Sequence, residues 1–91
     1  MPEVLYTIQL PDGVQKQCYS PSTVVRDYFS EGEVMPVSEF RDRSRKALAE
    51  ASERVRANFG FSCSSASLQL AEIEQFTRSF QGDQSVRIIS I

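Results

Sequence analysis

The residue with the most potential for chemistry is Cys63, which lies just before a predicted helix. At a helix N-terminus, the helix dipole and the free N–H groups stabilise a thiolate. A reactive or redox-sensing thiol is therefore one hypothesis for this position. The plainer interpretation is that Cys63 fills the junction between a loop and a helix, because the sequence shows no base or phosphate-loop motif to go with it.

Hydroxyl side chains surround this cysteine, at Ser62, Ser64 and Ser65. Together with the first N–H groups of a helix they could hold a phosphate or a carboxylate. Serine is also the ordinary capping residue of a helix, and no glycine-rich loop or G-K-[ST] motif accompanies these serines. An anion-binding regulator stays open as a second hypothesis for the segment.

The sequence contains few candidate residues for the common kinds of enzyme catalysis. Histidine is absent, which excludes Ser-His-Asp and Cys-His catalysis and every histidine-containing metal site. Glu72 and Glu74 are two residues apart on a predicted helix, so they point in different directions. Glu50 and Glu53 alternate with basic residues, which is typical of a solvated helix face. We expect no catalytic residue, no metal and no cofactor.

A locally basic segment spans residues 41–46 and continues at Arg54 and Arg56. Helical spacing places Arg41, Arg45 and Arg56 in a stripe that could meet an acidic protein surface or a nucleic acid. The alternative is a solvated face that pairs with nearby carboxylates. The net charge of −2 and the lack of interleaved aromatic residues argue against nucleic acid as the partner.

Length and composition indicate a single domain over residues 1–91. The chain is 41% hydrophobic and 24% charged, as in an ordinary globular domain. It has no apolar run near the ~20 residues of a membrane helix, and its first residues do not resemble a signal peptide. We therefore expect a soluble cytoplasmic protein without a membrane partner. Cys18 and Cys63 are then reduced thiols, although the sequence leaves a disulfide between them open.

Alternating apolar residues predict three strands. Residues 3–10 place Val4, Tyr6, Ile8 and Leu10 on one face. The Pro-Asp-Gly turn that follows predicts a hairpin with a more polar second strand over residues 14–19, suited to a sheet edge. Residues 85–90 predict the last strand.

Helical periodicity predicts three helices. A short helix is expected from Ser20, as its cap, to about Phe29. A long amphipathic helix over residues 37–59 would span about 34 Å and end at Gly60. A third is expected over about residues 65–80. The fold class is therefore α+β: a two-layer β-β-α-α-α-β sandwich in which a three-stranded sheet, with the first strand central, packs against an antiparallel helix pair.

Several segments, in this order, resemble one small bacterial family. The segments are Met1-Pro2-Glu3-Val4, Pro11-Asp12-Gly13, Cys18-Tyr19-Ser20-Pro21-Ser22-Thr23-Val24, Pro36-Val37-Ser38-Glu39-Phe40, Arg54-Val55-Arg56-Ala57-Asn58-Phe59-Gly60-Phe61-Ser62-Cys63-Ser64 and Gln69-Leu70-Ala71-Glu72-Ile73-Glu74. The chain is similar here to the nitrogen-starvation response small proteins that are encoded beside a nitrilase.

This resemblance implies a setting and no catalytic residue. The family's gene neighbourhoods include a nitrilase-type hydrolase, a radical SAM protein, an acetyltransferase-like protein and a flavoprotein. We accordingly expect a non-enzymatic accessory protein that binds a protein from the same gene cluster in a nitrile-utilisation pathway. The expected contacts are Arg41, Arg45 and Arg56 on the long helix and Ser62, Cys63, Ser64 and Ser65 at the following loop. A homodimer is compatible with this hypothesis, as it is with the ligand-binding and thiol hypotheses.

Overall fold

The chain begins with a β-hairpin, and both of its strands belong to a larger sheet. The computed structural model describes residues 3–60 and 64–91. Strand β1 (Val4–Gln9) pairs antiparallel with β2 (Gln15–Ser20). In the turn, the Asp12 carboxylate accepts a hydrogen bond from the Val14 N–H at 3.1 Å, and Gly13 takes a φ of 89°. Glycine suits this left-handed conformation because it has no Cβ. The predicted hairpin is therefore confirmed.

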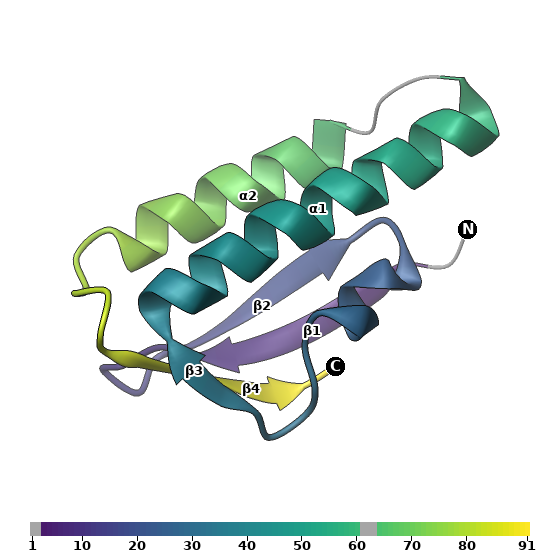
Figure 1. Cartoon of the computed structure of the whole chain (residues 1–91). Coiled ribbons are helices and arrows are strands. Elements are labelled where there is room, and N and C mark those ends of the chain that lie inside the picture. Colours follow the sequence, from purple (N-terminus) through teal and green to yellow (C-terminus); the bar gives the residue numbers. More distant parts are fainter. Residues whose placement is uncertain (1–2, 61–63) are drawn as a thin grey trace.

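The sheet has four strands in the order β2-β1-β4-β3, with every neighbouring pair antiparallel (Figure 1). Strand β4 (Ser85–Ser90) lies against β1, and β3 (Val34–Pro36) lies at the far edge. The prediction that β1 is flanked by the hairpin strand and the last strand is confirmed. The prediction of a three-stranded sheet is wrong, because β3 adds an edge.

Strand β3 is too short to produce an alternating pattern in the sequence. It has three residues, of which only Met35 is buried. Backbone hydrogen bonds extend the pairing on both sides, from the Ile88 N–H to the Glu33 carbonyl at 2.8 Å and from the Val37 N–H to the Gln84 carbonyl at 2.7 Å. The strand therefore exists through its contacts with β4 rather than through its own propensity.

The first predicted helix is a single 3₁₀ segment, η1 (Thr23–Asp27). Its cap is Ser22, whose hydroxyl accepts a hydrogen bond from the Val24 N–H at 3.3 Å. Ser20, the predicted cap, is the last residue of β2. The observed order is therefore β-β-3₁₀-β-α-α-β, with two α-helices in place of the three that were predicted.

Helix α1 has the predicted bounds, Val37–Phe59. It buries Phe40, Ala47, Leu48 and Ala51 on one side, as its apolar spacing requires. Gly60 ends it with a φ of 79°, and its N–H donates to the Arg56 carbonyl at 2.8 Å. The predicted glycine C-cap is therefore confirmed.

Helix α2 (Ser64–Thr77) is three residues shorter at its C-terminus than the predicted residues 65–80. Figure 1 shows α1 and α2 side by side on the same face of the sheet. The confirmed class is thus α+β, in two layers. Within residues 3–60 and 64–91, neither helix combines the length and apolar character that crossing a membrane requires.

Aromatic side chains join the two layers at the centre of the core. The Phe29 ring, next to η1, lies 6.1 Å from the Tyr6 ring of β1 and 5.5 Å from the Phe40 ring of α1. All three side chains are almost completely buried. The segment after η1 therefore contributes to the core between helix and sheet.

Candidate functional site

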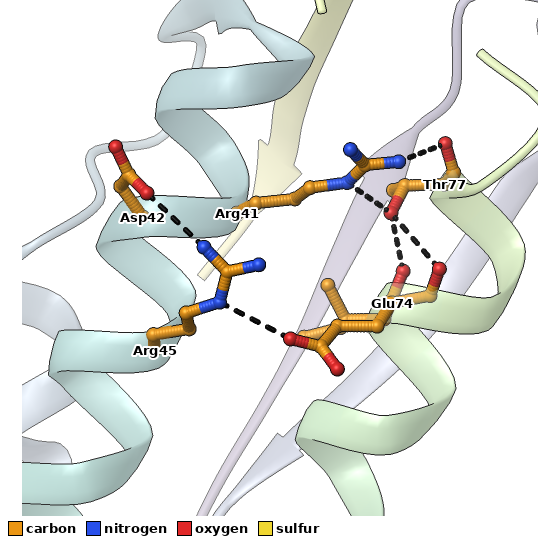
Figure 2. A network of polar contacts seen from close by, with 6 residues as sticks. Arg41, Asp42, Arg45, Glu74 and Thr77 are labelled. Atoms are coloured by element: carbon orange, nitrogen blue, oxygen red, sulfur yellow. Dashed lines mark hydrogen bonds and ion pairs between the residues drawn. The ribbon is translucent and has the colours of Figure 1, made fainter.

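Arg41 and Arg45, two residues of the predicted basic stripe, connect α1 to α2. The Arg41 guanidinium donates to the Thr77 hydroxyl at 2.9 Å and to the Thr77 carbonyl at 2.5 Å (Figure 2). Thr77 is the last residue of α2, so Arg41 satisfies a C-terminal carbonyl and places a positive charge at the negative end of the helix dipole. Arg41 thus has a structural role, whatever else it contacts.

Arg45 forms two ion pairs on the same side of the helix pair. It contacts Glu74 of α2 at 3.1 Å and Asp42 of its own helix at 3.2 Å (Figure 2). Arg56 lies about three turns farther along α1 and contacts Glu53 at 3.6 Å. The structure therefore places Arg41 and Arg45 together and leaves Arg56 apart. Their role as partner contacts stays a prediction.

Arg43 uses its charge inside the fold as well. It donates to Glu33 at 2.7 Å, to Glu39 at 3.0 Å and to the Tyr28 carbonyl at 3.1 Å. The hydrogen bond from Arg43 holds the pKa of the Glu33 carboxyl below its usual value. The basic segment of the sequence is therefore largely neutralised by nearby carboxylates, which weakens its field towards a distant acidic partner.

Alanine substitutions of Arg41 and Arg56 should change the free energy of unfolding by different amounts, because Arg41 contacts α2 and Arg56 is exposed. We expect Arg41→Ala to lower the free energy of unfolding by about 1–2 kcal/mol, because the buried hydroxyl and carbonyl of Thr77 lose a charged donor. Arg56→Ala, at a side chain that is 62% exposed, should change it by less than about 0.5 kcal/mol. Urea unfolding of both variants checks this, and equal losses would contradict it.

The predicted thiol and serine site lies only partly within the described residues. Ser62 and Cys63 fall outside them. Ser64 and Ser65 are the exposed first residues of α2. The anion and thiol hypotheses for this segment stay predictions.

The other thiol, Cys18, belongs to the core. It is a free cysteine on the helix-facing side of β2 and is 1% exposed. Burial, with a smaller effect of the nearby Glu72 carboxylate, raises the pKa of the Cys18 thiol to about 12. A protonated, enclosed thiol is a poor nucleophile, so Cys18 acts as a small apolar residue. In residues 3–60 and 64–91, no three His, Cys, Asp or Glu side chains are grouped to hold a metal.

The second face of the sheet carries neither helix (Figure 1). Strand alternation and register place on it the side chains that are exposed or half-buried, opposite the core-facing set. We call this surface the open face; its residues are Leu5, Thr7, Gln9, Gln15, Gln17, Tyr19, Val34, Pro36, Ser85 and Arg87. Two large apolar side chains stand out on it, Leu5 at 60% and Val34 at 51% exposure.

A shallow depression of about 390 Å³ lies at one end of the open face. Gln9, Leu10, Pro11, Val34, Ser85 and Arg87 line it. Among the described residues, Arg87 is the only charged residue of this lining, and it has no ion-pair partner. An uncompensated cation beside apolar carbon can bind a carboxylate while the surrounding surface excludes water.

The alternation that places Val4, Tyr6 and Ile8 on one face of the first strand leaves Leu5 on the other face, but sequence reasoning did not identify the open face as a site. The available signal was a leucine on the side of a strand that was expected to face solvent. Val34 gave no such signal, because β3 itself was not predicted.

The family model of the nitrogen starvation-induced protein NitG matches residues 5–91 of the chain. No curated protein and no solved structure matches it significantly. The match runs from Leu5 in β1 through β4, and therefore includes every listed residue of the open face.

Proposed function

Because the chain belongs to the NitG family of nitrogen starvation-induced proteins, we propose that it is a non-enzymatic accessory protein of the nitrogen-starvation response that acts by binding another protein. The finer setting rests on the sequence resemblance. It is a cytoplasmic pathway that takes nitrogen from nitriles or cyanide, with the partner encoded in the same nitrilase-containing gene cluster.

The observation that carries this proposal is the pair of exposed apolar side chains on the open face. Leu5 lies on the central strand β1 and Val34 on the edge strand β3. Val34 is in line with Gln9 through Arg87. It therefore lies at the other end of β1 from Leu5, and a partner that covers both must extend across β1, β4 and β3. Apolar surface that one partner covers in this way is typical of protein-binding sites. Covering Leu5 and Val34 with apolar side chains of a partner would remove them from water without rearranging the core.

Charge complementarity narrows the chemistry of the partner. Arg87 is paired across the strands with Gln9 on one side and Val34 on the other, so it lies between polar and apolar parts of the open face. A partner with an apolar patch and a neighbouring aspartate or glutamate fits this arrangement. Its carboxylate would form an ion pair with Arg87 at the depression.

A pull-down from nitrogen-starved lysate, read by mass spectrometry, tests the proposal with a matched pair of variants. Leu5→Glu changes the open face, and Leu68→Glu makes the same change at a leucine of α2 with 66% exposure. We expect the wild-type and Leu68→Glu baits to retain the same cluster protein. Leu5→Glu should retain at least about tenfold less, since a central contact is commonly worth more than 1.4 kcal/mol.

Two results would count against the proposal. Equal retention by the Leu5→Glu bait would show that the open face is the wrong surface. A wild-type bait that retains no cluster protein, from a lysate in which those proteins are present, would contradict protein binding itself.

A further inference from the structure

The sheet has two edges, and β3 is closed to a further strand. Glu33 and Val37 direct backbone groups towards β4, so strand alternation directs those of Val34 and Pro36 outward. Pro36 has no N–H to donate, and the strand is only three residues long. An incoming strand would therefore find little to pair with at this edge.

The other edge, β2, presents outward backbone groups over six residues. The Leu10 N–H donates to the Val14 carbonyl at 2.8 Å, so the even-numbered residues that follow Val14 direct their backbone towards β1. Gln15, Gln17 and Tyr19 then direct theirs outward. The Tyr19 N–H confirms this alternation, because it donates away from β1 to the Gln69 side chain at 3.0 Å.

Gln69 of α2 closes one end of this edge. Its side-chain oxygen occupies the place where the carbonyl of an added strand would accept the Tyr19 N–H. The residue is 7% exposed, and its amide nitrogen has no hydrogen-bond partner among the described residues. The remainder of the edge, at Gln15 and Gln17, offers two N–H donors and two carbonyl acceptors, one of each per residue.

A groove runs beside this part of the edge, between β2 and α2. It has a volume of about 490 Å³ and is lined by Lys16, Gln17, Glu72, Gln75 and Phe76. Lys16 and Glu72 both lack an ion-pair partner within residues 3–60 and 64–91. Among the residues that the structure describes, no strand pairs with this edge. A free strand edge next to a groove under a helix is the arrangement that binds extended peptides by strand addition.

We propose that an extended segment of a partner protein adds to β2 as an antiparallel strand at Gln15–Gln17. Its backbone pairs with the outward groups of Gln15 and Gln17. The side chain opposite Lys16 lies on the groove side of the sheet and is acidic, because a carboxylate directly across the strands pairs with the lysine; Glu72, which also lines the groove, opposes this charge. Strand addition uses the backbone edge of β2, whereas the function proposed above rests on the exposed Leu5 and Val34 side chains and on Arg87, so it does not depend on that function.

A second copy of the chain does not fit the same edge. An antiparallel self-pairing centred on Lys16 places two lysines directly opposite one another, which is destabilising. A self-pairing centred on Gln17 needs the Tyr19 N–H of both copies, and Gln69 already accepts that hydrogen bond. The registers centred on Lys16 and on Gln17 are therefore disfavoured, which favours a segment of a different chain.

The test is a titration of the ¹⁵N-labelled full chain with the peptide acetyl-Thr-Val-Glu-Val-Thr-amide, followed by amide chemical shifts. With the glutamate opposite Lys16, the two valines pair with Gln15 and Gln17. We expect saturable shifts centred on Gln15–Gln17 and the facing part of α2. A peptide N-methylated at both valines should bind at least about tenfold more weakly, because it lacks the two donors.

A pair of edge variants completes the test. Gln17→Pro removes an N–H that points away from β1, so the sheet keeps its ladder, and Gln17→Thr keeps the N–H as the control. We expect Gln17→Pro to lose at least tenfold in affinity relative to Gln17→Thr, and a lysine in place of the peptide glutamate to weaken binding at least threefold. The absence of saturable shifts at millimolar peptide, or equal binding of the N-methylated peptide, would overturn the proposal.

Because the titration uses no partner from lysate, its failure leaves the open-face proposal standing. Loss of retention by the Leu5→Glu bait, conversely, does not test strand addition.

Discussion

Replacing Phe40 by alanine should lower the free energy of unfolding by about 3–5 kcal/mol, the range for a fully buried phenylalanine. The ring is 0% exposed and packs against the Phe29 ring, which in turn stacks on Tyr6. The variant therefore leaves a cavity where α1, β1 and the segment after η1 meet. Urea unfolding followed by circular dichroism measures the loss.

Phe76→Ala is the matched control for this large effect. Phe76 is only partly buried, at the groove between α2 and β2, so the same truncation should cost less than about half as much. A loss below 1 kcal/mol for Phe40→Ala, or equal losses for the two variants, would show that the aromatic cluster does not hold the layers together.

Alkaline pH should destabilise the fold through Cys18. The unfolded thiol releases its proton near its ordinary pKa of 9.0, whereas burial in the folded chain raises the pKa to about 12. The stability from the protonated thiol is therefore fully present below pH 9 and is lost as the pH rises towards 12. Each pH unit in this window lowers the free energy of unfolding by about 1.4 kcal/mol.

Cys18→Ala isolates this contribution, because all other groups titrate in both proteins. Between pH 9 and pH 11, wild type should lose about 2–3 kcal/mol more than the variant in urea unfolding. Burial also raises the pKa of the Tyr6 phenol. Above pH 10 this adds to the loss of unfolding free energy in both proteins, and Tyr6→Phe should reduce this additional loss. Parallel profiles of wild type and Cys18→Ala would contradict the burial of the thiol.

Those parts of the fold that depend on long periodic segments were predictable. The bounds of α1 follow from apolar spacing between Pro36 and Gly60, and the centre of the sheet follows from the alternation of Val4, Tyr6 and Ile8. These signals are local, because each element buries one regular face.

Elements that depend on their neighbours were missed or misassigned. Strand β3 is defined by its pairing with β4. Its sequence, with only Val34 and Met35 as apolar strand-type residues, is too short to predict a strand. In the segment after β2, Ser22 rather than Ser20 caps a 3₁₀ turn, since pairing with Val4 holds Ser20 in the strand. Tertiary contacts decided both cases.

The candidate surfaces show the same limit. The sequence identified Arg41 and Arg45 as charged helix residues, but their contacts with Thr77 and Glu74 depend on how α2 docks. The edge of β2 is free at Gln15–Gln17 but closed at Tyr19, because the Tyr19 N–H donates to Gln69, which is 50 residues away in sequence. Contacts of such sequence separation leave no local pattern to detect.

The most direct test of the central claim, that the open face binds a partner, is a map of the contact on the chain itself. The ¹⁵N-labelled chain is titrated with the purified protein that the wild-type bait retains, and amide shifts and line broadening are followed residue by residue. The account predicts that the changes concentrate at Leu5, Thr7, Val34 and Arg87 and that Leu5→Glu abolishes them. Changes confined to α1 around Arg41, Arg45 and Arg56, with the open face unaffected, would contradict it.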